Sequence, residues 1–197
     1  DIFRYYSHYL RALLGDKSKE VGLRKFYGSD SGRRLKESNL MDNLMHLVNF
    51  WYYVNTEDDP KDWDETYSIS LKARKYLHCL EHYPNEFWKY PTSVFFLKFY
   101  KEKNFESSFT SFLKDLIGNL FIKFIDYPSV NAIKDDTYTS CIEIINGNGI
   151  KYRIGITKEE LSQRIPFYSS SRISRALLLL HAYLDEGQNE IIPWSFE

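Results

Sequence analysis

Residues 105–125 read FESSFTSFLKDLIGNLFIKFI, and this stretch decides the fold class. Its apolar residues recur three or four positions apart, which is the spacing of an α-helix, and they cover nearly the whole circumference. They are Phe109, Phe112, Leu113, Leu116, Leu120, Phe121 and Phe124. A helix that is apolar nearly all round is typically buried. We therefore expect a central helix with other helices packed around it.

Helical spacing also dominates the part of the chain before this stretch. One apolar face is expected on a first helix that ends at Gly15 and Asp16, and another on a long helix that begins near Arg33. The first face consists of Phe3, Tyr6, Leu10, Leu13 and Leu14, and the second of Leu40, Leu44, Leu47, Val48 and Trp51. Further helices are predicted over residues 18–27, 63–83 and 94–100.

The part after the central helix is less uniform. Thr157 and Glu160 have the spacing of a capping box, which predicts a helix that opens at Lys158. Another apolar helix follows over residues 173–184. Two interpretations stay open for the ambiguous stretch 136–156: a short helix over 138–145, or two strands around the Asn-Gly-Asn-Gly sequence 146–149. The predicted fold is mainly α, a multi-helix bundle, with a small β-hairpin or short strands near 142–156 and 191–196 as the open alternative.

Composition limits the function. The chain has 197 residues and a net charge of −1, so DNA binding would have to come from local basic patches. Cys79 and Cys141 lack the close spacing of a metal site, and we expect them to be reduced, buried and structural. Reduced cysteines indicate a cytoplasmic protein. The longest apolar runs fall short of the roughly 18 residues that span a bilayer, so we expect no membrane partner.

Several stretches resemble one family in their order along the chain. They are FRYYSHYLRALLGD (3–16), NLMDNLMHLVNFW (39–51), VNAIKD (130–135) and SSRISRALLLLHAYL (170–184), followed by Trp194, Phe196 and Glu197. Together they are similar to the central helical region of GmrSD-type modification-dependent restriction enzymes. In that family an apolar helix leads to a W-x-F-E segment, and the His of an HNH-type nuclease motif comes a few residues later.

The resemblance implies a domain division and a role. Residues 1–170 would be the central helical domain, and residues 171–197 would be the truncated start of a C-terminal HNH-type nuclease domain. The nuclease His would lie beyond Glu197, and the D-G-Q-Q-R motif of an N-terminal ParB-like nucleotide-hydrolysing domain is not in this sequence. The parent would use a divalent metal and a nucleoside triphosphate to cut foreign or modified DNA, as in phage defence. This part would have no catalytic residue or cofactor of its own, and would position the other domains of the same chain.

Basic residues are the candidate DNA contacts. Arg172 and Arg175 stand three positions apart at the start of the helix that would lead to the nuclease segment. Lys25, Arg33 and Arg34 belong to two further basic clusters, which also include Lys17, Lys19, Arg24 and Lys36. Such clusters could follow a phosphate backbone. The alternative is a solvated helix surface balanced by neighbouring acids, and for Arg172 and Arg175 a packing or salt-bridging role.

Two other motifs could carry chemistry. His78, Glu81 and His82 match the inverted zinc motif H-x-x-E-H, but no third ligand is evident, so a surface or packing pair is the favoured interpretation. The aromatic residues among 87–90 could stack on bases or fill a gap between helices. His8, His46 and His181 are further metal or acid–base candidates. A lone His beside an apolar face, as at His46 and His181, is usually a satisfied or half-buried histidine. Two alternatives to the nuclease module therefore remain: a stand-alone helical interaction module, and a small helical metalloenzyme that uses His78, Glu81 and His82.

Overall fold

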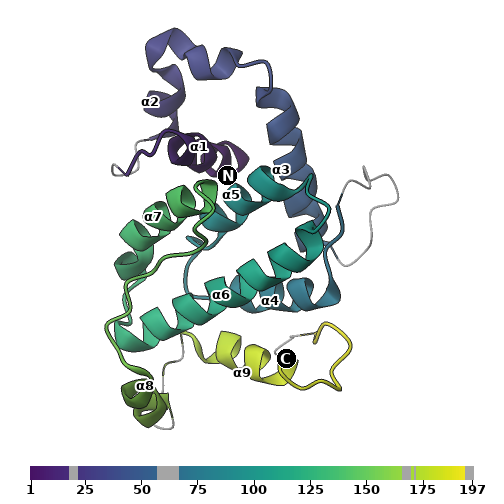
Figure 1. Cartoon of the computed structure of the whole chain (residues 1–197), viewed down its shortest axis with the longest axis vertical. Helices are drawn as coiled ribbons and strands as arrows, with labels where there is room; N and C mark the ends of the chain where they lie inside the picture. Colours follow the sequence, from purple (N-terminus) through teal and green to yellow (C-terminus); the bar gives the residue numbers. More distant parts are fainter. Residues whose placement is uncertain (18–21, 57–66, 166–169, 171, 194–197) are drawn as a thin grey trace.

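The computed structural model describes residues 1–17, 22–56, 67–165, 170 and 172–193 (Figure 1). In chain order, its elements are α1 (Ile2–Leu13), α2 (Leu23–Gly28), η1 (Asp30–Lys36), α3 (Leu40–Asn55), α4 (Leu71–Glu81), α5 (Lys89–Phe99), α6 (Phe105–Asp126), η2 (Val130–Ile133), α7 (Lys134–Ile145), α8 (Lys158–Arg164) and α9 (Ser174–Tyr183). No strand occurs in these ranges. The mainly α bundle is confirmed.

The helices pack in two groups on either side of α5 and α6. α1 contacts α5 and α7, and these two also contact each other. α4 lies between α6 and α9 and contacts both. α2 and η1 connect α1 to α3 at one end of the long axis, and α8 and α9 lie toward the other end (Figure 1). None of the described helices combines the length and the apolar character needed to cross a membrane.

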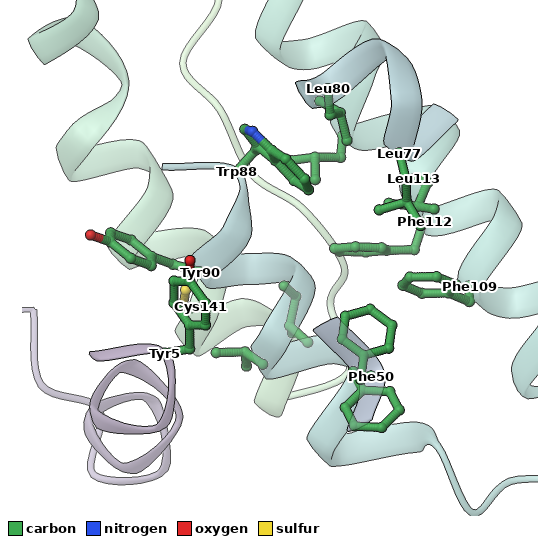
Figure 2. Close-up of a cluster of buried hydrophobic side chains, with 14 of the residues drawn as sticks. Tyr5, Phe50, Leu77, Leu80, Trp88, Tyr90, Phe109, Phe112, Leu113 and Cys141 are labelled. Carbon is green, nitrogen blue, oxygen red and sulfur yellow. The ribbon is translucent and has the colours of Figure 1, made fainter. Parts of the chain in front are cut away.

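Aromatic rings join α3, α5 and α6 in the core (Figure 2). The ring of Phe50 stacks on that of Phe96 with centroids 4.3 Å apart, and it meets Phe109 edge-on at 5.8 Å. The rings of Phe95 and Phe112 stack at 4.2 Å. Such pairs contribute roughly 0.5–1.5 kcal/mol beyond the burial of their area. Much of the large Phe and Tyr content therefore serves to hold the helices together.

The central helix α6 is less uniformly buried than the sequence suggests. Phe109, Leu113, Leu116 and Leu120 are fully buried. An exposed face nevertheless runs along its first half, and it consists of Glu106, Ser107, Ser111, Lys114 and Asp115. The prediction of a central helix is confirmed, but the helix is amphipathic there and not surrounded on all sides.

Three predicted helix starts were wrong. α3 begins at Leu40 and not near Arg33, because residues 33–36 belong to the separate 3-10 turn η1, which ends at Glu37 in an extended conformation (φ −65°, ψ 131°). α4 begins at Leu71, where the Ser70 hydroxyl accepts a hydrogen bond from the Ala73 amide; residues 67–70 are not helical, and 63–66 lie outside the described ranges. α5 begins at Lys89 and not at 94, since proline is tolerated in the first turn of a helix, where Pro91 lies.

The hairpin alternative was also wrong, because the glycine sequence ends a helix. Gly147 has a φ of 80°, and the amide of Asn148 donates to the carbonyl of Glu143, as in a Schellman motif. α1 ends in the same way: Gly15 has a φ of 64°, and the Asp16 amide donates to the Arg11 carbonyl. The predicted end of α1 is therefore confirmed, and α7 ends by the same device.

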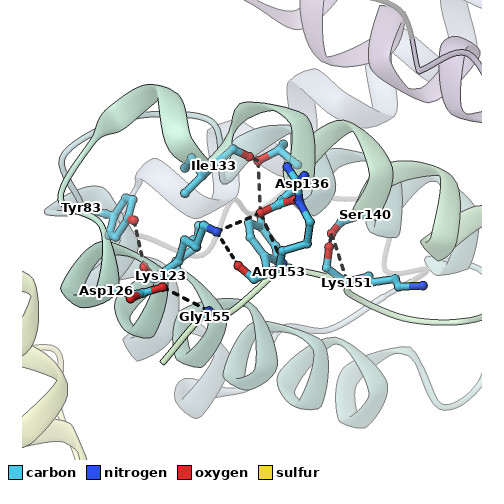
Figure 3. A network of polar contacts seen from close by, with 12 residues as sticks. Tyr83, Lys123, Asp126, Ile133, Asp136, Ser140, Lys151, Arg153 and Gly155 are labelled. Atoms are coloured by element: carbon cyan, nitrogen blue, oxygen red, sulfur yellow. Dashed lines mark hydrogen bonds and ion pairs between the residues drawn. The ribbon is translucent and has the colours of Figure 1, made fainter. Parts of the chain in front are cut away.

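Residues 150–156 run beside α6 and α7 without forming a strand (Figure 3). Backbone amides at alternate positions donate to side chains of these helices: Lys151 to Ser140 Oγ at 3.0 Å, Arg153 to Asp136 Oδ2 at 3.3 Å, and Gly155 to Asp126 Oδ2 at 3.1 Å. Helix side chains thus replace a partner strand. Residues 191–193 form no strand either, and 194–196 lie outside the described ranges.

The capping box is confirmed. The Glu160 amide donates to Thr157 Oγ1 at 3.2 Å, and the Thr157 amide donates to the Glu160 carboxylate at 2.8 Å. This reciprocal pair satisfies two amides that the helix itself leaves without a partner. α8 begins at Lys158, as the sequence predicts.

Candidate functional site

The two predicted DNA-binding groups lie at opposite ends of the molecule. Lys25 belongs to α2, and Arg33 and Arg34 belong to η1, at one end of the long axis. Arg175 is in the first turn of α9 near the other end, and Arg172 precedes it (Figure 1). The residues therefore form two separate basic groups and no single patch.

Arg34 is occupied in closing the end of α2. Its Nη1 donates to the Phe26 carbonyl at 2.7 Å and to Ser29 Oγ at 2.5 Å, and its guanidinium carbon lies 4.4 Å from the centre of the Phe26 ring. Lys25 and Arg33 are exposed. At this end of the molecule, these two side chains are the more accessible candidates for phosphate.

The other basic group lies beside the histidine pair. His78 lies in α4, and His82 is the C-terminal cap of that helix. Their ring centroids are 5.2 Å apart, as expected for positions i and i+4 on one helix. Burial, and then the positive charge of Arg175, lower the pKa of His82. Arg175 is exposed, and so is Arg172. α4 and α9 therefore bring together a histidine pair and a candidate DNA contact that are far apart in the sequence.

Tyr183 connects this site to the C-terminal segment. Its hydroxyl lies 2.6 Å from His78 Nδ1 and accepts a hydrogen bond from the Ile192 amide at 3.0 Å. Burial, and then the proximity of His82, lower the pKa of His78, so its neutral form is favoured. Sequence reasoning missed Tyr183, because it is 105 positions away from His78.

A cavity of about 590 Å³ lies next to His78. Its lining combines the end of α3, one side of α4 and the C-terminal segment: Val54, Asn55, Thr56, Arg74, His78, Glu81, Glu190, Ile191, Ile192 and Pro193. His82 is not in this lining. Among the described residues, no three His, Cys, Asp or Glu side chains lie close enough together to hold one metal ion.

The remaining histidine and cysteine candidates of the core are structural. His8 stacks between Tyr90, with ring centroids 3.9 Å apart, and Tyr138, at 5.1 Å. Burial, with the nearby charges of Arg11, Arg4 and Lys134, lowers the pKa of His8 to about 3. Burial raises the pKa of the Cys79 thiol to about 12 and also raises that of Cys141. The predicted buried, unpaired state of both cysteines is confirmed.

A charge cluster around a buried carboxylate joins α6, α7 and the segment 150–156 (Figure 3). The Asp136 carboxylate is buried and lies 2.6 Å from Arg153 Nε and 3.5 Å from Lys123 Nζ. Tyr152, also buried, has its hydroxyl 3.2 Å from Thr137 Oγ1. Because the buried carboxylate pairs with the nearly buried Lys123 and with the exposed Arg153 of the segment 150–156, its role here is to hold this segment in place. Sequence reasoning missed the cluster, since no motif marks it.

The aromatic residues among 87–90 fill a gap between helices. Trp88 is 1% exposed and meets Trp51 edge-on at 5.6 Å. Tyr90 is buried against His8. Neither ring can stack on a base without leaving the core, so the base-stacking interpretation was wrong for both. His46 likewise packs its ring against Tyr100, at 4.6 Å.

Comparison of the chain with protein-family models, with characterised proteins and with solved structures found no match.

Proposed function

We propose that this chain is a non-catalytic helical module of a GmrSD-like modification-dependent restriction endonuclease used in phage defence. In the parent protein, the module positions a ParB-like nucleotide-hydrolysing domain against an HNH-type nuclease domain and contacts DNA. The divalent metal and the nucleoside triphosphate belong to those other domains. The proposal originates in the sequence resemblance, and the arrangement of the C-terminal segment supports it.

The supporting observation is that the C-terminal segment is bound to the helical body at two points. The Lys75 ammonium donates a hydrogen bond to the carbonyl of Gln188, and the Ile192 amide donates to the Tyr183 hydroxyl. Lys75 is itself buried, which strengthens the first contact, because a buried ammonium needs an acceptor. If the nuclease domain starts at residue 171, these contacts would hold its first part against α4 of the helical domain, so it would not swing on a free linker.

The placement of Arg172 and Arg175 suggests where DNA would run. Both are exposed on the same end of the molecule as the bound segment. DNA held there would lie close to the part of the nuclease domain that continues beyond residue 193. We therefore assign the DNA contact to this pair ahead of Lys25 and Arg33 at the opposite end.

DNA retention by the chain, measured across a salt series, tests this assignment. Replacing both arginines (Arg172→Ala with Arg175→Ala) removes up to two phosphate contacts. The negative slope of log affinity against log salt should then become shallower by roughly 1.8. The matched control, Lys25→Ala with Arg33→Ala, should leave the slope unchanged. If the native chain shows no salt-dependent retention, the DNA contact is refuted.

The coding sequence around this chain tests the domain assignment directly. An HNH-type His within a few codons after Glu197, with a D-G-Q-Q-R-like motif upstream, would support the nuclease parent. A stop codon directly after Glu197 would refute it and leave a stand-alone helical module.

A second candidate function, a metal site on His78 and His82, is favoured by one observation. The hydrogen bond between His78 Nδ1 and Tyr183 orients the ring and leaves Nε2 as the nitrogen available to a metal, as second-shell partners do in zinc proteins. Titration with Co²⁺, followed by its visible absorption, tests this candidate. A spectrum that disappears in the His82→Ala variant would support a metal site, and a flat titration would exclude one for this ion.

A further inference from the structure

α3 carries a row of exposed apolar side chains on its outer side. These four residues, named here the α3 seam, are Met41 (64% exposed), Met45 (52%), Val48 (41%) and Tyr52 (59%). The residues directly before them, Leu40, Leu44, Leu47 and Trp51, are buried in the core, on a face roughly 100° around the helix axis. α3 therefore has two apolar faces, of which the bundle covers one.

The spacing within the α3 seam indicates the shape of what would cover it. The residues follow one another at intervals of four, three and four positions, which is the spacing of a and d positions in a coiled coil. An average interval of 3.5 residues keeps the seam facing a second helix that crosses at about 20°. The α3 seam therefore matches an α-helix with the same repeat better than an extended peptide.

The charges of α3 indicate that the helix covering the seam is the α3 of a second copy. Asp42 is its only Asp, Glu, Lys or Arg residue, so a second α3 brings almost no repulsion with it. We consider two copies packed antiparallel, with Met45 opposite Val48 of the second copy and Met41 opposite Tyr52. Asp42 then lies beside Asn49 of the second copy, on the flank of the seam. Both side chains are exposed, and an amide can donate to a carboxylate.

The position of α3 in the fold allows this pairing. α3 lies along the outer edge of the helical body (Figure 1). Its contacts to α1, α5 and η1 come from its inner side, so a second copy could reach the α3 seam without displacing any of these elements. A twofold axis at this edge makes the contact self-complementary, as in most homodimers.

From these observations we propose that the protein self-associates through the α3 seam, with the α3 helices of two copies packed antiparallel about a twofold axis. The proposal is independent of the nuclease assignment, because it concerns a surface far from Arg172 and Arg175.

Sedimentation equilibrium of the chain over a concentration series tests it. The native chain should form a dimer. Two lysines in the seam (Met45→Lys with Val48→Lys) place like charges opposite each other and should weaken the dimer by on the order of a hundredfold or more. The control, Leu178→Lys, changes an apolar residue of α9 that is at least as exposed, at 59%, and should leave the dimer intact. Circular dichroism verifies that each variant is folded.

A charge-paired variant tests the antiparallel arrangement. Met45→Glu with Val48→Lys places opposite charges across the interface only when position 45 faces position 48 of the second copy, and such a variant should remain dimeric. If it is monomeric like the double-lysine variant, the antiparallel arrangement is wrong. A native chain that stays monomeric at every concentration would overturn the whole proposal, whatever the DNA measurement shows.

Discussion

The imidazole of His8 stacks on the ring of Tyr90 with centroids 3.9 Å apart and planes inclined by 20°. This contact joins α1 to α5, and on its other side the imidazole faces Tyr138 of α7. One histidine thus lies at the junction of three helices that are distant in the sequence. Its ionisation state must therefore affect the stability of the whole bundle.

Acid should destabilise the protein through His8. Its pKa is about 3 in the folded state against an ordinary value of 6.5, so between these values the unfolded state binds the additional proton. The contribution of neutral His8 to the free energy of unfolding is complete above pH 6.5. It decreases as the pH falls, and about 2 kcal/mol of it is lost at pH 5. Denaturant unfolding of the native chain and of His8→Phe at pH 7 and pH 5 measures this. The variant keeps a stacked ring but cannot bind the proton. Its free energy of unfolding should therefore fall between pH 7 and pH 5 by about 2 kcal/mol less than that of the native chain. The control His181→Phe, at an exposed site, should behave like the native chain.

Removal of the Asp136 carboxylate should be costly. Asp136→Asn leaves Lys123, whose side chain is only 14% exposed, without its ionic partner, and we expect a loss of about 3 kcal/mol in the free energy of unfolding. The neighbouring Asp135→Asn changes an exposed carboxylate and should cost less than about 0.5 kcal/mol. Urea unfolding of the two variants compares them directly. Equal stabilities would show that the cluster does not hold the segment 150–156.

Two glycines should respond in opposite directions to the same substitution. Gly147→Ala places a side chain at a φ of 80°, where only glycine is unstrained, and should cost about 1 kcal/mol. Gly118→Ala lies inside α6, where an added Cβ meets no atom within 4 Å, and should stabilise the fold by roughly 0.5–1 kcal/mol. Thermal unfolding of both variants decides the matter. A neutral Gly147→Ala would contradict the glycine-dependent end of α7.

Both thiols should be unreactive in the native protein. Cys79 and Cys141 are buried, and their raised pKa values keep them protonated at neutral pH. A colourimetric thiol reagent should therefore label neither residue until denaturant unfolds the chain, and should then label both. Rapid labelling of the folded protein would mean that the core around α4 or α7 opens readily.

Local patterns predicted most of the fold. The apolar faces of α1, α3 and α6 depend on residues within one helix, and so does the capping box at Thr157, since these partners are three or four positions apart. Two of the wrong predictions arose where one residue type is compatible with two structures. Gly147 suits both a hairpin turn and a helix end, and which of them forms depends on the acceptor of the Asn148 amide. Pro91 can end a helix or lie in its first turn.

The candidate site was less predictable, because its partners are far apart in the chain. The sequence placed His78 and His82 on one face of a helix, and this was confirmed. It could not indicate that Tyr183 binds His78, nor that Arg34 caps α2 in place of facing solvent. Nothing in the sequence distinguished Asp136 from the exposed acids around it. These contacts exist only once the helices have packed.

The junction at His8 also has a consequence for how the protein is made. Tyr138, the second ring against His8, comes 130 positions later in the chain. At roughly 5–20 residues per second, a ribosome needs on the order of ten seconds to deliver it. During that time α1 cannot place His8 against its second ring. The first of the described helices to be synthesised is thus completed only after α7 has been made, and a nascent chain stalled before Tyr138 should be a substrate for chaperones.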